Sequence, residues 1–142
     1  MRYYLLFCGL LLITSCNSSK KESLVEVKEG LIMAPRSEMA ILMNEMYAFN
    51  ESIKQQIISG SINNAYPIHF DRIDSATLTD PTDRDASFET FSQEFIHKTK
   101  AVFESSSSDA LFKYNEAVNA CIACHQTTCI GPIPRIEKLL IK

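Results

Sequence analysis

The residues best suited to chemistry lie near the C-terminus, in the run Cys121-Ile122-Ala123-Cys124-His125. In a C-x-x-C-H motif, the two thiols can add to the two vinyl groups of a haem while the adjacent imidazole turns toward the iron. The motif therefore predicts a covalently bound haem c, attached through Cys121 and Cys124, with His125 as the proximal ligand of the iron.

Two other kinds of site use a similar cysteine pair. A redox-active C-x-x-C normally follows a strand in a βαβ context, and no strand pattern of useful length is present here. A zinc site would need a fourth ligand beyond the motif or Cys129, and the only other histidines are His69 and His97. We interpret Cys129 as a small buried apolar residue or a free thiol; the alternative is an intermolecular disulfide or a redox-active thiol near the haem edge.

The N-terminus has the pattern of an export signal. Arg2 precedes an almost wholly apolar run over residues 3–13, which is too short for a comfortable membrane span and typical of a signal peptide. The run ends in Ile13-Thr14-Ser15-Cys16, which resembles the lipobox of bacterial lipoproteins. We expect residues 1–15 to be removed, Cys16 to be lipidated, and residues 16–33 to form a lipidated, flexible tether. The alternatives are an ordinary cleavable signal or an uncleaved anchor.

This interpretation places the protein on the periplasmic side of a bacterial membrane, with the choice between inner and outer membrane left open. Of the five cysteines, Cys8 would leave with the signal and Cys16 would carry the lipid. The three that remain are an odd number, so they cannot form a simple disulfide framework.

Composition limits the remaining chain to one helical domain, residues 34–142. The chain has 142 residues, 46% of them hydrophobic, with no Trp and only 4 Gly. This balance favours a helical core over a glycine-punctuated β fold. The net charge is −3, so the basic surface that nucleic-acid binding requires is missing.

Apolar residues recur at helical spacing in three long segments, over about 35–59, 84–104 and 109–125. A shorter helix or irregular segment is expected over about 64–76, a turn at 79–83, and a short C-terminal helix at about 134–141. We expect Pro35 in the first turn, Gly60 at the end of the first helix, and Ser108 or Asp109 as a helix cap. The expected core residues are Met39, Leu42, Met43, Met46, Phe49, Ile53, Ile57, Phe88, Phe91, Phe95, Val102, Phe103, Leu111, Tyr114 and Val118.

A haem motif on the last long helix resembles the class II c-type cytochromes, of the cytochrome c-prime type. The resemblance covers about residues 34–128. It rests on the C-terminal C-x-x-C-H motif and on a first helix that opens with Arg36, followed by Met39, Leu42 and Met43. It implies an all-α fold, a four-helix bundle with the haem attached to the last long helix. The chain departs from that pattern in its short second helix, its long turn at 79–83 and its extension over 131–142.

In that family a residue of the first helix faces the sixth position of the iron, either an apolar residue or a Met ligand. The resemblance makes Met43 and Met39 the candidate distal ligands. The register around Arg36 brings Ala40 close to the sixth position of the iron. Met46 follows Met39 and Met43 at helical spacing. We interpret His69 as a surface or helix-cap residue, with contact to the haem as the alternative, and His97 as a solvated residue.

The expected function is electron transfer by an exported, membrane-anchored c-type cytochrome, with redox partner proteins in the periplasm. The alternative is a five-coordinate haem protein that binds small gases such as nitric oxide or carbon monoxide. A peroxidase would need a distal His or Arg near the iron. Only His69 and Arg36 could serve, and no pattern places either of them there, so we do not expect an enzyme. Homodimers are common in the family, and the sequence leaves this alternative open.

Overall fold

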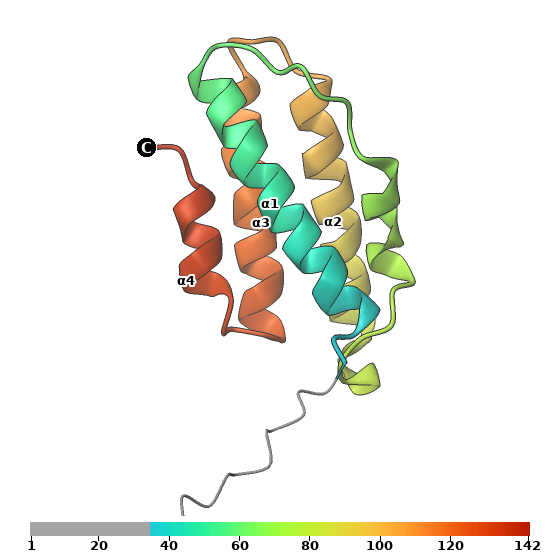
Figure 1. Cartoon of the computed structure of the whole chain (residues 1–142). Coiled ribbons are helices and arrows are strands. Elements are labelled where there is room, and N and C mark those ends of the chain that lie inside the picture. The colour runs from blue at the N-terminus through green and yellow to red at the C-terminus, as the bar shows by residue number, and fades with distance from the viewer. Residues whose placement is uncertain (1–34) are drawn as a thin grey trace, which may run out of the picture. The chain divides into compact units, whose positions relative to one another are not determined.

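The computed structural model describes residues 35–142, and all the regular structure in this part of the chain is helical. The long helices are α1 (Glu38–Ile58), α2 (Ala86–Phe103) and α3 (Ala110–Thr127) (Figure 1). A short helix, α4 (Ile133–Ile136), follows them in the chain. Three 3-10 helices complete the set: η1 (Ile68–Asp74), η2 (Pro81–Asp83) and η3 (Glu137–Leu139). The all-α expectation is confirmed for these residues.

The expected signal segment 1–15, the lipidated Cys16 and the tether 16–33 lie outside the described residues. Within residues 35–142, every helix is either too short or too polar to cross a bilayer.

Local hydrogen bonds set the ends of α1. The Ser37 hydroxyl accepts from the backbone N–H of Ala40 at 3.1 Å, so Ser37 is the N-cap and the helix begins at Glu38. Pro35 therefore precedes the helix, and its expected place in the first turn is wrong. At the other end Gly60 has a φ of +89°, which glycine adopts without steric cost. The expectation that α1 ends at Gly60 is confirmed to within two residues.

Different caps begin the other long helices. The Asp85 carboxylate accepts from the Phe88 N–H at 2.7 Å and starts α2. Asp109 stands at the N-cap position of α3, but its carboxylate accepts from the Ser106 hydroxyl at 2.8 Å instead of from a helix N–H. The expectation of Asp109 as the cap is confirmed for its position, but its backbone is in the αR region and its side chain accepts no helix N–H.

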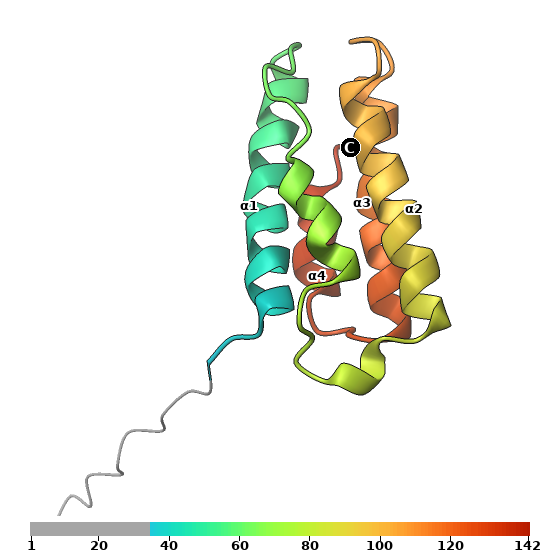
Figure 2. The same ribbon diagram turned by 90° about the vertical axis from the view of Figure 1, so that its right-hand side faces the viewer.

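The helices α2 and α3 run side by side, while α1 stands apart from this pair (Figure 2). The segment with η1 lies on one side of the space between α1 and the pair, and α4 lies on the other. The C-terminal segment, with α4 and η3, lies along α1 and α3. Two short segments thus separate the long helices where a regular bundle would bring them together.

The core consists of two clusters of buried side chains. The first joins α1, the η1 segment and α2, and the second joins α1, α2, α3 and the C-terminal segment. Cys121 and Phe49 pack against both clusters, so the first cysteine of the motif lies where they meet. Most expected core positions are buried or half-buried, but Leu111 is 45% exposed and was predicted wrongly.

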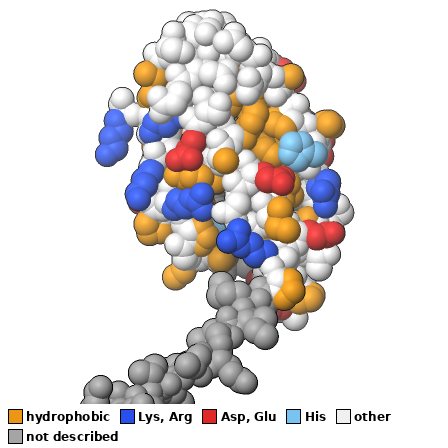
Figure 3. Space-filling model, viewed as in Figure 1, with side chains coloured by type: hydrophobic (Ala, Val, Ile, Leu, Met, Phe, Trp, Pro, Cys, Tyr) orange, Lys and Arg blue, Asp and Glu red, His pale blue; other side chains and the backbone are white. Residues whose placement is uncertain are grey.

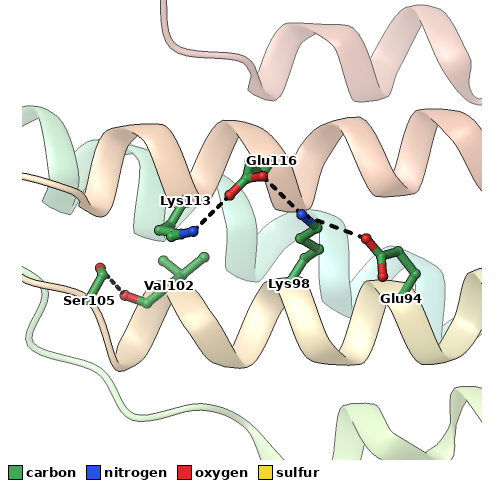
Figure 4. A network of polar contacts seen from close by, with 6 residues as sticks. All are labelled: Glu94, Lys98, Val102, Ser105, Lys113 and Glu116. Carbon is green, nitrogen blue, oxygen red and sulfur yellow. Dashed lines mark hydrogen bonds and ion pairs between the residues drawn. The ribbon is translucent and has the colours of Figure 1, made fainter.

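One partly exposed ion pair connects α2 and α3, and two further pairs flank it within the helices (Figure 4). The Glu116 carboxylate lies 2.9 Å from Lys98 Nζ and 3.1 Å from Lys113 Nζ, and Lys98 also lies 3.7 Å from Glu94. At the end of α2 the Ser105 hydroxyl donates to the Val102 carbonyl at 2.7 Å. The Lys98–Glu116 pair joins the two helices, but partly exposed pairs of this kind contribute little to the stability of the fold.

The segment between η1 and α2 is held against the start of α1. The Met39 N–H donates to the Thr77 carbonyl at 3.0 Å, and the Thr77 hydroxyl and N–H both donate to the Glu38 carboxylate at 3.0 Å. The segment that follows, with Leu78 and Thr79, is thereby fixed beside the first turn of α1. This contact closes one side of the candidate site.

Candidate haem-binding site

A cavity of about 320 Å³ lies where α1 diverges from α3. This volume is at the lower end of the range usual for small-molecule sites. Its walls are predominantly apolar, with side chains from α1, α2, α3, the segment 73–83 and the C-terminal segment. Among the lining residues are Met39, Ala40, Met43, Met46, Phe88, Phe95, Cys121, Cys124, His125, Ile136 and Leu139.

The three motif residues line one wall of this cavity. They lie within α3 at positions i, i+3 and i+4, which places Cys121, Cys124 and His125 on one helix face. Each is half-buried, and both thiols are free. The structure thus brings together the residues that the sequence singled out for haem attachment.

Burial favours the neutral form of both thiols of the motif. Burial, together with the neighbouring Cys124, raises the pKa of Cys121 to about 12. Burial also raises the pKa of Cys124. A redox-active C-x-x-C has a lowered thiol pKa, helped by the positive end of a helix, whereas this pair lies near the C-terminal end of α3. The local chemistry is therefore unlike that of a thiol–disulfide exchange site.

The His125 ring is oriented by a backbone oxygen. Its Nδ1 lies 2.7 Å from the carbonyl oxygen of Cys129, in the turn that follows α3. A carbonyl can only accept, so in the neutral imidazole Nδ1 carries the proton and Nε2 keeps its lone pair. Histidines that bind metals usually donate their other ring N–H in this way.

The candidate distal residues lie in the same cavity, on α1. Met39 is buried and Met43 is half-buried, one helical turn apart, with Ala40 beside them. Met46, one turn further on, is buried and also lines the cavity. No contact distinguishes the sulfur of Met43 from that of Met39, so the preference for Met43 over Met39 as the distal ligand stays a prediction.

The two other histidines and Arg36 lie elsewhere. His69 is exposed, with its Nε2 3.8 Å from a Glu45 carboxylate oxygen, and it does not line the cavity. His97 and Arg36 are also exposed and outside it. The expectations of a surface role for His69 and a solvated His97 agree with these positions. Cys129 is an exposed free thiol that borders the cavity, so the interpretation as a free thiol agrees with the structure and the one as a buried apolar residue is wrong.

Sequence reasoning missed the polar part of the lining, which includes Asn44, Tyr47, Asn50 and Arg135. Asn44 and Tyr47 follow Met43 within one helical turn, so the register of α1 could have placed them near the same wall. Arg135 belongs to the C-terminal segment, and no pattern in the sequence indicates that this segment folds back onto α1.

Within residues 35–142, the structure has no group of three or more His, Cys, Asp or Glu side chains placed to hold a metal ion by themselves. Comparisons of the chain with protein-family models, with curated proteins and with solved structures found no match.

Proposed function

We propose that this chain is a c-type haem protein that transfers electrons, with the haem attached through Cys121 and Cys124 and the iron held by His125. One observation carries the proposal. The C-x-x-C-H face of α3 and two methionines of α1 line a single apolar cavity, and the hydrogen bond to Cys129 leaves Nε2 of His125 free for a metal.

The residues present fit such a group. A porphyrin has a large apolar body, and the cavity walls are built largely from Met, Phe, Ile and Leu side chains. The two thiols lie on the same helix face as the imidazole, which is the arrangement that attachment at adjacent vinyl groups next to an axial ligand requires. When bound, the haem would supply a one-electron redox centre.

The chain's own residues would have separate tasks. His125 would hold the iron, with its ring oriented by the Cys129 carbonyl. The apolar walls would exclude water, which together with a thioether ligand from Met43 or Met39 would raise the reduction potential. We propose electron transfer without catalysis.

The likeness to class II c-type cytochromes is part of the same proposal. In it, η1 takes the place of the second helix of a four-helix bundle, shortened to seven residues after Pro67. The lipid on Cys16, the periplasmic location and the periplasmic redox partners belong to this proposal too.

A second candidate function is the binding of small gases such as nitric oxide or carbon monoxide. The observation that favours it is Ala40, which lines the cavity between Met39 and Met43 and offers no ligand atom. If both methionines serve only as packing, the sixth position of the iron opens onto an apolar space. Such a space would admit a diatomic gas and exclude bulkier polar molecules.

Optical spectroscopy of protein matured with its haem-attachment machinery tests both functions. Electron transfer through a Met ligand predicts a low-spin spectrum with a thioether charge-transfer band that carbon monoxide does not change. Gas binding predicts a high-spin spectrum that shifts with carbon monoxide. The absence of covalent haem, shown by an unchanged mass, would contradict the central proposal.

Three matched variants assign the ligand. Met43→Leu and Met39→Leu remove the two candidate sulfurs, and Met46→Leu removes a third from the same stripe at similar volume. We expect one of the first two to abolish the charge-transfer band and the third to preserve it. Loss of the band in the Met46→Leu variant alone would show that the register of α1 assumed here is wrong.

A further inference from the structure

One permanent cation stands in the wall of the apolar cavity. Arg135, on α4, has its Cζ 3.7 Å from the centroid of the Tyr47 ring. Its Nη1 donates to the Asn44 side-chain oxygen at 3.0 Å. Within residues 35–142, no carboxylate lies within ion-pair distance of Arg135, although exposed ion pairs occur elsewhere on this surface.

These contacts hold the guanidinium in a fixed plane and use only part of its hydrogen-bonding capacity. A guanidinium has five N–H donors in a rigid fork, and only one of its nitrogens has a partner here. Stacking on an aromatic ring fixes the orientation of the fork. The arrangement is that of a preorganised donor whose usual partner is a planar carboxylate bound at two points.

The segment that carries Arg135 is itself anchored. Lys54 Nζ, on α1, donates to the carbonyls of Lys138 at 2.7 Å and Leu140 at 3.0 Å. Figure 3 shows Lys and Arg side chains gathered on the side where α4 lies in the same view.

We propose that Arg135 binds a carboxylate of the cavity's ligand, which for a haem is one of its two propionate groups. This inference rests on the proposed function and adds the orientation of the ligand to it. The other ionisable groups that face the cavity are Asp83 on η2, Tyr47 on α1, and the His125 and cysteine side chains. Asp83 would repel a carboxylate, so the acidic edge of the ligand lies toward α4 and away from η2.

The test uses the full-length, matured haem protein in three forms. Arg135→Gln removes the proposed anchor. Lys138→Gln makes the same change of charge three residues later, on an exposed side chain outside the cavity. The readouts are the protonation of each haem carboxylate, followed by NMR with isotope-labelled haem, and the pH dependence of the reduction potential.

We expect Arg135→Gln to raise the proton affinity of one haem carboxylate about tenfold and to leave the other unchanged, because a cation within contact distance stabilises the ionised form. The reduction potential should acquire a matching pH dependence. Lys138→Gln should reproduce the wild-type titration. Equal titrations in wild type and Arg135→Gln, with covalent haem present in both, would overturn the inference and leave the proposed function intact. A wild-type chain without covalent haem would overturn the proposed function itself.

Two further variants keep the inference testable if Arg135→Gln does not fold. Arg135→Lys keeps the charge without the fork, and Asn44→Ala keeps the guanidinium but removes its hydrogen-bonded support. Each should raise the same carboxylate's proton affinity by less than the Gln variant would. Wild-type titrations in both variants would contradict the role of a fixed guanidinium.

Discussion

Replacing Tyr114 by Phe tests the contact that holds α3 to α1 beside the cavity. The Tyr114 side chain is fully buried, and its hydroxyl donates to the Asn50 carbonyl at 3.0 Å. Asn50 is itself buried and lines the cavity. Burial raises the pKa of Tyr114, so the hydroxyl remains a neutral donor throughout the accessible pH range.

The expected loss of stability follows from the hydrogen bond that Tyr114→Phe removes. One buried hydrogen bond is worth about 1 kcal/mol net, and the acceptor left behind adds part of its desolvation cost. The Phe ring fills the same space as the Tyr ring, so the substitution leaves little empty volume and loses little packing energy. We therefore expect a loss of about 1–2 kcal/mol in the free energy of unfolding, which for a domain of this size lowers Tm by roughly 5–10 °C.

Urea unfolding followed by far-UV circular dichroism measures this loss in the haem-free and haem-bound protein. Tyr47→Phe is the matched control, because the Tyr47 hydroxyl makes no hydrogen bond within the described residues; it should change stability by less than about 0.5 kcal/mol. Equal stabilities of the Tyr114→Phe and Tyr47→Phe variants would refute the reasoning.

Three further predictions concern the helices. Ser37→Ala should cost about 1 kcal/mol of unfolding free energy by removing the N-cap of α1, and an unchanged thermal midpoint would contradict that role. Gly60→Ala should cost about 1 kcal/mol, because an L-residue is strained at a φ of +89°; chemical denaturation that shows a gain would be inconsistent with this backbone conformation. Lys98 and Lys113 hold the pKa of Glu116 below its usual 4.5, so its stabilisation is complete above that pH and is lost as pH falls through the lower, folded-state pKa. Thermal unfolding from neutral to acid pH should accordingly show a weaker pH dependence in Glu116→Gln, and parallel curves would argue against the ion pairs.

The positions of the long helices were predictable because local signals agree with tertiary packing. Met39, Met46 and Ile53 recur at helical spacing and are all buried, as are Phe88 and Phe95 on the next long helix. Leu111 was predicted wrongly because the buried face of α3 begins at Ala110 and continues through Tyr114, so Leu111 lies beside this face and not on it.

The candidate site was only half predictable. A helix turn places Cys121, Cys124 and His125 on one face without any knowledge of the fold. The cavity depends on the divergence of α1 from α3, and that divergence depends on two short segments, η1 and α4. No local pattern encodes their position, so Arg135 could not have been found from spacing alone, whereas the register of α1 could have placed Asn44 and Tyr47 near the cavity.

The acceptor that orients His125 is part of the main chain, so this acceptor, unlike a side-chain carboxylate, is neither protonated in acid nor lost by substitution. A carboxylate in the same place could be protonated or substituted, and the imidazole would then change its tautomer. The Cys129 carbonyl has no accessible titration and persists whatever side chain stands at position 129. The orientation of His125 therefore depends on the backbone conformation of residues 128–132, which include Gly131 and Pro132. It does not depend on the identity of a neighbouring side chain.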